Sequence, residues 1–128
     1  MSEYQRYPID KSVIREKQFG QSRPANTNAV SIYSPASNVT AIIRSIVICN
    51  TTALAATYRL FVDDDGTTYD ETTAIVFDTS LAANTSTVMD VYWPMANAAG
   101  NIAVRTGTLN AITFTVFGDE VTRTVGNV

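Results

Sequence analysis

The side chains that most often carry out catalysis are scarce in this sequence of 128 residues. It has no histidine, and Cys49 is its single cysteine. These two facts exclude the serine–histidine–aspartate triad, the cysteine–histidine pair, most transition-metal sites and zinc sites made of cysteines alone. Both lysines, Lys11 and Lys17, lie in a charged segment rather than in the apolar setting that activates an amine. Carboxylate chemistry is what remains.

The densest group of carboxylates is the run Asp63, Asp64 and Asp65, which Gly66 follows. Several oxygens close together could bind a hard cation, but an EF-hand loop that starts at Asp63 would need glycine at its sixth position and glutamate at its twelfth. Gly66 is fourth and Ala74 is twelfth. An Asp-Gly pair between strands is typical of a turn, so we expect a hairpin turn, and an adventitious cation on residues 63–71 stays open.

No spacing of the other carboxylates selects the facing pair that glycoside hydrolysis requires. Four aromatic residues, Tyr58, Tyr69, Tyr92 and Trp93, could form a platform that binds a sugar. Trp93 is expected to pack inward instead, because it alternates with apolar neighbours on one face of a strand. The sequence therefore predicts a protein that is no enzyme and needs no cofactor or metal.

The elements around these residues are strands. The chain is only 16% charged and is rich in Thr, Asn, Ser and Ala, which suits strands and tight turns. From residue 29 onward apolar and polar residues alternate with a period of two in seven short runs separated by turn residues. This pattern predicts a single all-β sandwich, jelly-roll or immunoglobulin-like, with about seven to eight antiparallel strands. The runs are 30–33, 39–50, 55–62, 73–77, 87–93, 102–104 and 112–116, the last of which Gly118 is expected to end.

The run 39–50 differs from the others because both of its alternating faces are substantially apolar. One face must line the core of the domain. We expect the other face to be covered by an arm, by a loop or by another subunit. The candidate interface residues on this second face are Ile42, Ile46 and Ile48.

Residues 1–28 are predicted to be an N-terminal arm, followed by the sandwich at 29–119 and a tail at 120–128. The arm is either extended or forms a short helix over residues 11–18, with Asp10 as N-cap and Gly20 beyond its end. It holds five basic and three acidic residues, whereas the rest of the chain holds four basic and nine acidic ones. An arm with a net positive charge favours contact with an acidic surface, either of the same chain or of a neighbouring one. Its candidate anchors are Ile9, Val13, Ile14 and Phe19.

The net charge and the distribution of apolar residues limit the partners and the location that can be expected. A net charge of −3 and a pI near 4.7 argue against a nucleic-acid binder, which carries a basic stripe. No run of residues approaches the ~20 apolar residues of a membrane span. The first residues lack the apolar core of a secretion signal, so we expect the chain to fold in a reducing cytosol with Cys49 as a small hydrophobic residue.

Six stretches of this sequence resemble a group of small virion proteins of tailed bacteriophages. The resemblance spans residues 19–120, and its motifs are structural rather than catalytic. The stretches are 19–22 (FGQS), 31–36 (SIYSPA), 45–50 (SIVICN), 55–60 (AATYRL), 81–84 (LAAN) and 114–120 (FTVFGDE). The resemblance implies a jelly-roll or immunoglobulin-like sandwich on the phage particle. It provides no catalytic residues.

The residues and the resemblance together predict a structural protein of the virion that decorates or cements the capsid. We expect it to bind itself as a homo-oligomer, with a trimer as the expected form, and to bind the major capsid protein or another virion protein. A structural component of the tail, neck or fibre is the first alternative. A carbohydrate-binding module for host attachment is the second.

Overall fold

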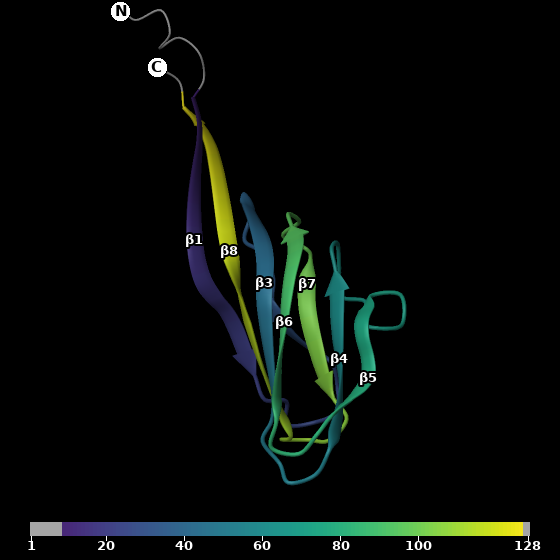
Figure 1. The fold of residues 1–128 in the computed structure, drawn as a ribbon. Coiled ribbons are helices and arrows are strands. Elements are labelled where there is room, and N and C mark those ends of the chain that lie inside the picture. Colours follow the sequence, from purple (N-terminus) through teal and green to yellow (C-terminus); the bar gives the residue numbers. More distant parts are fainter. Residues whose placement is uncertain (1–8, 127–128) are drawn as a thin grey trace, which may run out of the picture.

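Two antiparallel sheets of four strands each pack face to face in the computed structural model, which describes residues 9–126 (Figure 1). The first sheet has the order β1-β8-β3-β6, and the second has the order β2-β7-β4-β5. The described part of the chain contains no apolar helix long enough to span a membrane. The strands are β1 (Ile9–Ser22), β2 (Val30–Tyr33), β3 (Val39–Asn50), β4 (Ala56–Asp63), β5 (Ala74–Leu81), β6 (Ser86–Met95), β7 (Asn101–Thr106) and β8 (Ile112–Gly126).

The order of pairing identifies the sandwich as a jelly roll. β1 pairs with β8, β2 with β7, β3 with β6 and β4 with β5, so the first half of the chain runs antiparallel to the second half throughout. Rolling this long hairpin up adds the contacts of β8 with β3 and of β7 with β4, which close the two sheets. The predicted all-β sandwich is confirmed, and of its two forms the structure has the jelly roll.

The core between the sheets is made of the apolar residues that alternate along the strands. Ile43 and Ile46 from β3, Leu60 from β4, Val104 from β7 and Phe114 from β8 are fully buried there. β6 is an edge strand of the first sheet, and its inward side chains pack against the core although they are only half-buried. Trp93 is one of these, together with Met89 and Val91, as its alternation predicts.

A bulge explains why β3 looks apolar on both faces. The register of β3 with both of its neighbours shifts between Ile43 and Ser45, at the exposed Arg44. A bulge reverses the phase of the alternation, so Ile43 before it and Ile46 and Ile48 after it all point into the core. The expected second apolar face therefore does not exist in that form, since its residues Ile46 and Ile48 are core residues.

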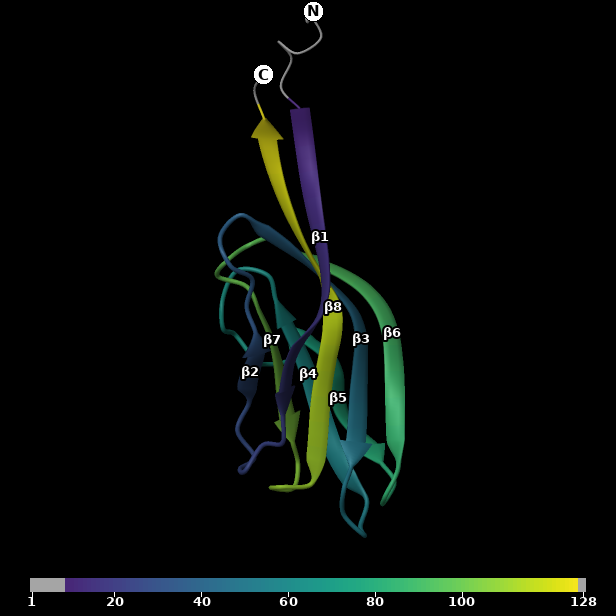
Figure 2. The ribbon, with the colours of Figure 1, turned by 90° about the vertical axis from the view of Figure 1, so that its left-hand side faces the viewer.

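The segment predicted as an arm is largely a strand of the first sheet. β1 pairs with β8 over its whole length, so the helical alternative for residues 11–18 is wrong. β8 continues past Gly118 to Gly126, beyond the end predicted for its run. Residues 9–12 pair with residues 123–126, where β8 has no second neighbour, and the two strands leave the sandwich as a ribbon (Figure 2). Residues 1–8 lie outside the described residues.

Two close approaches seat β1 on the body of the sandwich. Phe19 is buried and its ring stacks on that of Tyr33, with 4.1 Å between the ring centroids. The same ring lies against Gly118, where a Cβ would come within 2.8 Å of it, and a Cβ at Gly20 would come equally close to Ile32. Because the two glycines have no side chain, β1 can approach β2 and β8 closely at this point.

The acidic run forms a turn at the start of a longer loop. The Asp63 carboxylate ends β4 and accepts the backbone N–H groups of Thr68, at 2.8 Å, and of Asp65, at 3.2 Å. These hydrogen bonds lower the pKa of Asp63, with the one from Thr68 contributing most. Residues 64–73 follow as a loop rather than as a tight hairpin. No three metal-ligating side chains gather within residues 9–126.

Candidate interaction surface

The aromatic residues considered as a sugar platform are separated by the fold. Tyr58 lies in the core, where its ring meets that of Phe114 edge-on at 6.2 Å. Tyr69 lies in the loop 64–73 and packs on Phe61. Trp93 packs against the core, which leaves Tyr92 exposed on the outside of β6. A platform of these four side chains is therefore not formed.

The structure divides the seven predicted interface residues into two groups. Phe19, Ile46 and Ile48 are buried in the core and are unavailable to a partner, which corrects the prediction for them. Val13 and Ile14 are exposed on β1, by 57% and 64%, and Ile42 is half-buried on the outside of β3. For these three the interface role stays a prediction. Ile9 lies in the backbone of β1, and its side chain is outside the described residues.

The residues that face outward from the first sheet form a strip of apolar side chains. Opposite residues in neighbouring antiparallel strands share a face, so the register identifies the members of the strip. Ile14 is opposite Val121, and Val121 is opposite Thr40 in β3. Further along the same face, Val47 follows Ile42 on β3 and Phe117 lies on β8. We call these five residues the outer strip: Ile14, Ile42, Val47, Phe117 and Val121.

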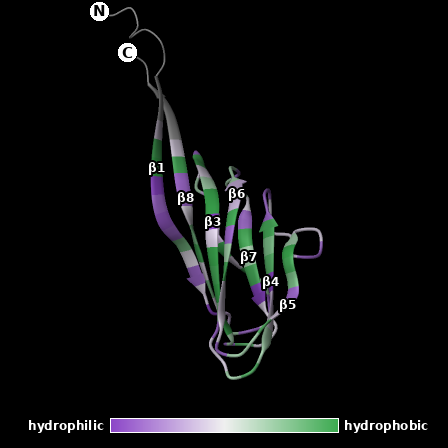
Figure 3. Cartoon of the chain, in the orientation of Figure 1, coloured by the Kyte–Doolittle hydropathy of each residue, from purple (hydrophilic) through white to green (hydrophobic). Residues whose placement is uncertain are grey.

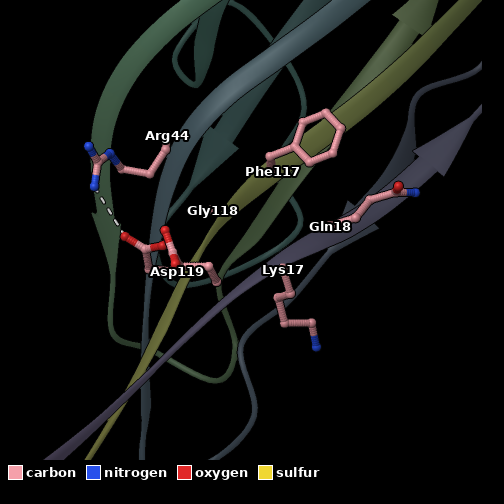
Figure 4. A pocket seen from close by; sticks show the side chains of 7 residues that line it. Lys17, Gln18, Arg44, Phe117, Gly118 and Asp119 are labelled. Carbon is pink, nitrogen blue, oxygen red and sulfur yellow. Dashed lines mark hydrogen bonds and ion pairs between the residues drawn. The ribbon is translucent and has the colours of Figure 1, made fainter.

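A hollow of about 460 Å³ lies beside Phe117, between β1, β3 and β8 (Figure 4). Charged side chains surround it, and one of them, Arg44, is paired with Asp119 at 3.1 Å. The Arg44 guanidinium also lies 5.7 Å from the ring centre of Tyr92 on β6. An apolar centre within a polar rim is the usual anatomy of a protein–protein contact. The lining residues are Glu16, Lys17, Gln18, Arg44, Phe117, Gly118 and Asp119.

A second hollow of about 430 Å³ continues the outer strip toward the ribbon. It is lined by Asn38, Thr40, Ile42 and Val121. Ile42 and Val121 belong to the outer strip, so the two hollows lie on one face of the sheet. Below the ribbon β1 is largely hydrophilic (Figure 3), and its exposed residues Arg15, Glu16 and Lys17 give this side of the sheet a charged border.

The outside of the second sheet is different, because the chain covers part of it. Phe61 and Ala103 are fully buried although they point away from the core. Tyr69 from the loop 64–73 covers Phe61, with 6.0 Å between their ring centres. The Asn101 side chain fixes this loop by donating a hydrogen bond of 3.0 Å to the carbonyl of Gly66. The centre of this face is therefore already packed, whereas the outer strip has no such cover in the described part of the chain.

A hydrogen bond fixes the junction of β2, β8 and β1 behind the outer strip. The Tyr33 hydroxyl donates to the Glu120 carboxylate at 2.6 Å, and the Lys17 ammonium lies 3.4 Å from the other carboxylate oxygen. Burial and the bond to Glu120 raise the pKa of Tyr33. The same bond, with the help of Lys17, lowers the pKa of Glu120 from its usual 4.5.

The Glu120 contact predicts how stability depends on pH. Because the pKa of Glu120 is lower in the folded protein, the carboxylate stabilises the fold above about pH 4.5, and this contribution is lost as the pH falls through the lowered pKa. Tyr33→Phe removes the main cause of the shift. We expect the variant to lose about 1 to 2 kcal/mol near neutral pH and to lose less than the parent on acidification.

Urea unfolding of both proteins from neutral to acidic pH measures this difference. Tyr92→Phe is the matched control, since Tyr92 is exposed on the outside of β6 and its ring contact with Arg44 survives the change. Parallel stability curves for Tyr33→Phe and the parent would contradict the expectation.

Sequence reasoning missed Phe117 and Val121, the two members of the outer strip on β8. The alternation places Phe114 and Val116 inward. Because Gly118 was expected to end the strand, Phe117 was not assigned to either face of it. A period-two pattern extended through Gly118 to Glu120 and Val121 would have found both residues.

Comparison with known proteins gives structural likenesses and no match in sequence. At the level of sequence, no protein family and no curated protein matches this chain. A chain of the T13 IBDV viral particle is similar in structure with a TM-score of 0.47 at 10% identity, over 89% of this chain and 31% of that one. The structure of the infectious bursal disease virus Gx strain gives 0.37 at 13% identity, over 92% and 40%.

A plant virus protein provides a third likeness. The Tobacco streak virus coat protein dimer is similar with a TM-score of 0.39 at 9% identity, over 93% of this chain and 88% of that one. This chain spans less than half of the first two proteins, at 31% and 40% of their length. The three likenesses to viral particle and coat proteins concern the fold alone.

Proposed function

We propose that this chain is a structural protein of a tailed-phage particle, which it binds from outside as a decoration or cement protein. The observation that carries the proposal is the outer strip: five apolar side chains on the outer face of the β1-β8-β3-β6 sheet, bordered by charged residues. The opposite face of the sandwich is partly closed by its own loop. The partner is the major capsid protein or another virion protein, and the location is the virion.

The fold narrows the choice of function without deciding it. Jelly rolls occur in viral capsid proteins and in lectins, so the surface has to distinguish between them. The aromatic residues that a sugar site would use are separated, which argues against the carbohydrate-binding alternative. The sequence resemblance over residues 19–120 favours the phage particle, and a place in the tail, neck or fibre would use the same surface.

A contact of this kind needs area and an anchor. A stable interface covers ~800 Å² on each partner, and one or two aromatic residues near its centre commonly carry most of the binding energy. Phe117 is the aromatic member of the outer strip and is 38% exposed at the edge of the first hollow. The charged side chains around this hollow would then exclude water and set the orientation of the partner.

Phe117→Lys tests the proposal without removing a strand. The full-length variant is added to particles assembled without this chain, and binding is measured by co-sedimentation. We expect its affinity to fall at least roughly tenfold, because a lysine would bury its charge in the contact. Ile75→Lys is the matched control, since Ile75 is 47% exposed on the outside of the other sheet, and it is expected to bind like the parent.

Equal binding of the Phe117 and Ile75 variants would contradict the proposal. Deletion of residues 1–28 would not be a useful test, because it removes β1 and with it the buried Phe19. Lost binding of that deletion would report damage to the sandwich rather than the loss of an arm.

A further inference from the structure

The four edge strands of the sandwich differ in how well they are protected against pairing with another strand. Exposed edges are usually blocked by charges, by bulges or by shortness. β1 carries exposed Arg15, Glu16 and Lys17. β2 is four residues long and has a register shift. β5 has two register shifts and the left-handed residue Asp78, with a φ of 53°.

β6 has this protection at one end only, because its register with β3 shifts at Val91 and Tyr92 but is regular from Ser86 to Asp90. It is ten residues long, contains the single charged residue Asp90, and in the described sheet has β3 on one side and no strand on the other. Its side chains are apolar on both faces, with Val88 and Tyr92 exposed by 56% and 63%. Pro94 protects only its last residues.

The direction of the free backbone groups on β6 follows from one hydrogen bond. The Asn50 N–H donates to the Thr85 carbonyl at 2.8 Å, so the backbone of Thr85 faces β3. In an antiparallel ladder the residues alternate, hence Thr87 and Met89 also face β3. The N–H and C=O groups of Ser86, Val88 and Asp90 therefore point out of the open edge.

From this geometry we infer that β6 is a self-pairing edge, which binds β6 of a second copy in an antiparallel, two-fold arrangement. A second copy is the occupant because a two-fold antiparallel pair satisfies the outward N–H and C=O groups of Ser86, Val88 and Asp90 with an identical strand. The other edges of a second copy are blocked by the features described above. This inference is independent of the particle-binding function, which uses the outer strip.

Charge selects the register of the pair. Asp90 opposite its own copy would place two like charges together, which disfavours a two-fold axis at Asp90. An axis at Val88 brings the two Val88 side chains together and sets Asp90 opposite Ser86 of the second copy. The Ser86 hydroxyl can then donate a hydrogen bond to the Asp90 carboxylate. The result is a dimer, which differs from the trimer expected from the sequence.

Molar mass in solution tests the pairing first. The full chain is expected to approach twice its 13.9 kDa as its concentration rises. Val88→Pro removes an outward N–H that makes no bond within the sheet, and an edge strand tolerates proline at such a position. We expect this variant to stay a monomer, with a dissociation constant of the dimer at least roughly tenfold higher than that of the parent, and still to bind particles.

Cysteine crosslinking tests the register and does not depend on the proline variant. The two Val88 residues that pair at the axis would have Cα atoms about 5.5 Å apart, a distance that a disulfide spans. In a Cys49→Ser background, Val88→Cys is expected to form a disulfide-linked dimer at least roughly ten times faster than Tyr92→Cys. Tyr92 is the matched control because it lies on the same strand and face, four residues from the axis.

A strictly monomeric parent, a trimer, or equal crosslinking of the two cysteine variants would overturn the inference. A dimer that Val88→Pro leaves intact would also overturn it. If particle binding fails while the parent dimerises through β6, the proposed function is wrong and the inference stands.

Discussion

Gly118→Ala is expected to cost the fold about 3 kcal/mol, the upper end of the cost of overpacking a packed site. A Cβ at this position would meet the backbone carbonyl oxygen of Ile42 and would lie 2.8 Å from the ring of Phe19. A backbone carbonyl in the middle of β3 cannot move aside without breaking the sheet. For a domain whose total stability is about 5 to 15 kcal/mol, this single methyl group would be a severe change.

Urea unfolding of the purified variant measures the loss. The double variant Phe19→Ala/Gly118→Ala removes the ring contact but leaves the clash with Ile42, so we expect it to be no more stable than Gly118→Ala. Gly66→Ala is the control, since its Cβ would meet only the end of the Asp63 side chain, at 3.2 Å. Parent-like stability of Gly118→Ala would show that β1 and β3 are not held as closely as described.

Phe114→Ala is expected to destabilise the protein by about 3 to 5 kcal/mol, the usual cost of deleting a buried ring. Phe114 is fully buried at the centre of the core, where its ring meets that of Tyr58. The sheets cannot close over the missing ring, because β8 is paired with a strand on each side. The variant should therefore unfold at a much lower urea concentration.

Phe117→Ala is the matched control for this prediction. It removes the same side chain from the same strand, three residues away, but on the exposed face of the sheet. We expect it to cost under about 1 kcal/mol, as is usual for surface changes. Equal losses for the two variants would contradict the assignment of the inner and outer faces of β8.

The alternation of apolar residues predicted seven of the eight strands, because their inner faces bury a core. β1 was missed for a physical reason. It is an edge strand whose residues 9–18 include five charged side chains, so no apolar alternation marks it before Phe19. It is held by hydrogen bonds to β8, by the buried Phe19 and by side-chain contacts such as the Lys17–Glu120 ion pair, and none of these is visible as a local pattern.

The candidate surface was predicted only in part, because its position depends on bulges. The bulge at Arg44 turns Ile46 and Ile48 inward, and without it the alternation assigns both residues to the outer face. Ile14 and Ile42 were predicted as interface residues, Ile14 in the arm and Ile42 on the second face of the run 39–50. Their neighbours across the strands depend on the order β1-β8-β3-β6, which local sequence patterns do not contain.

The proposed function places the outer face of the β1-β8-β3-β6 sheet against a phage particle. Electron cryo-microscopy of phage particles incubated with this chain tests the proposed placement directly. We expect density for the eight-stranded sandwich on the particle surface, with Phe117 and Ile42 buried against a neighbouring virion protein. Particles without the sandwich, or a sandwich attached with these residues facing solvent, would contradict it.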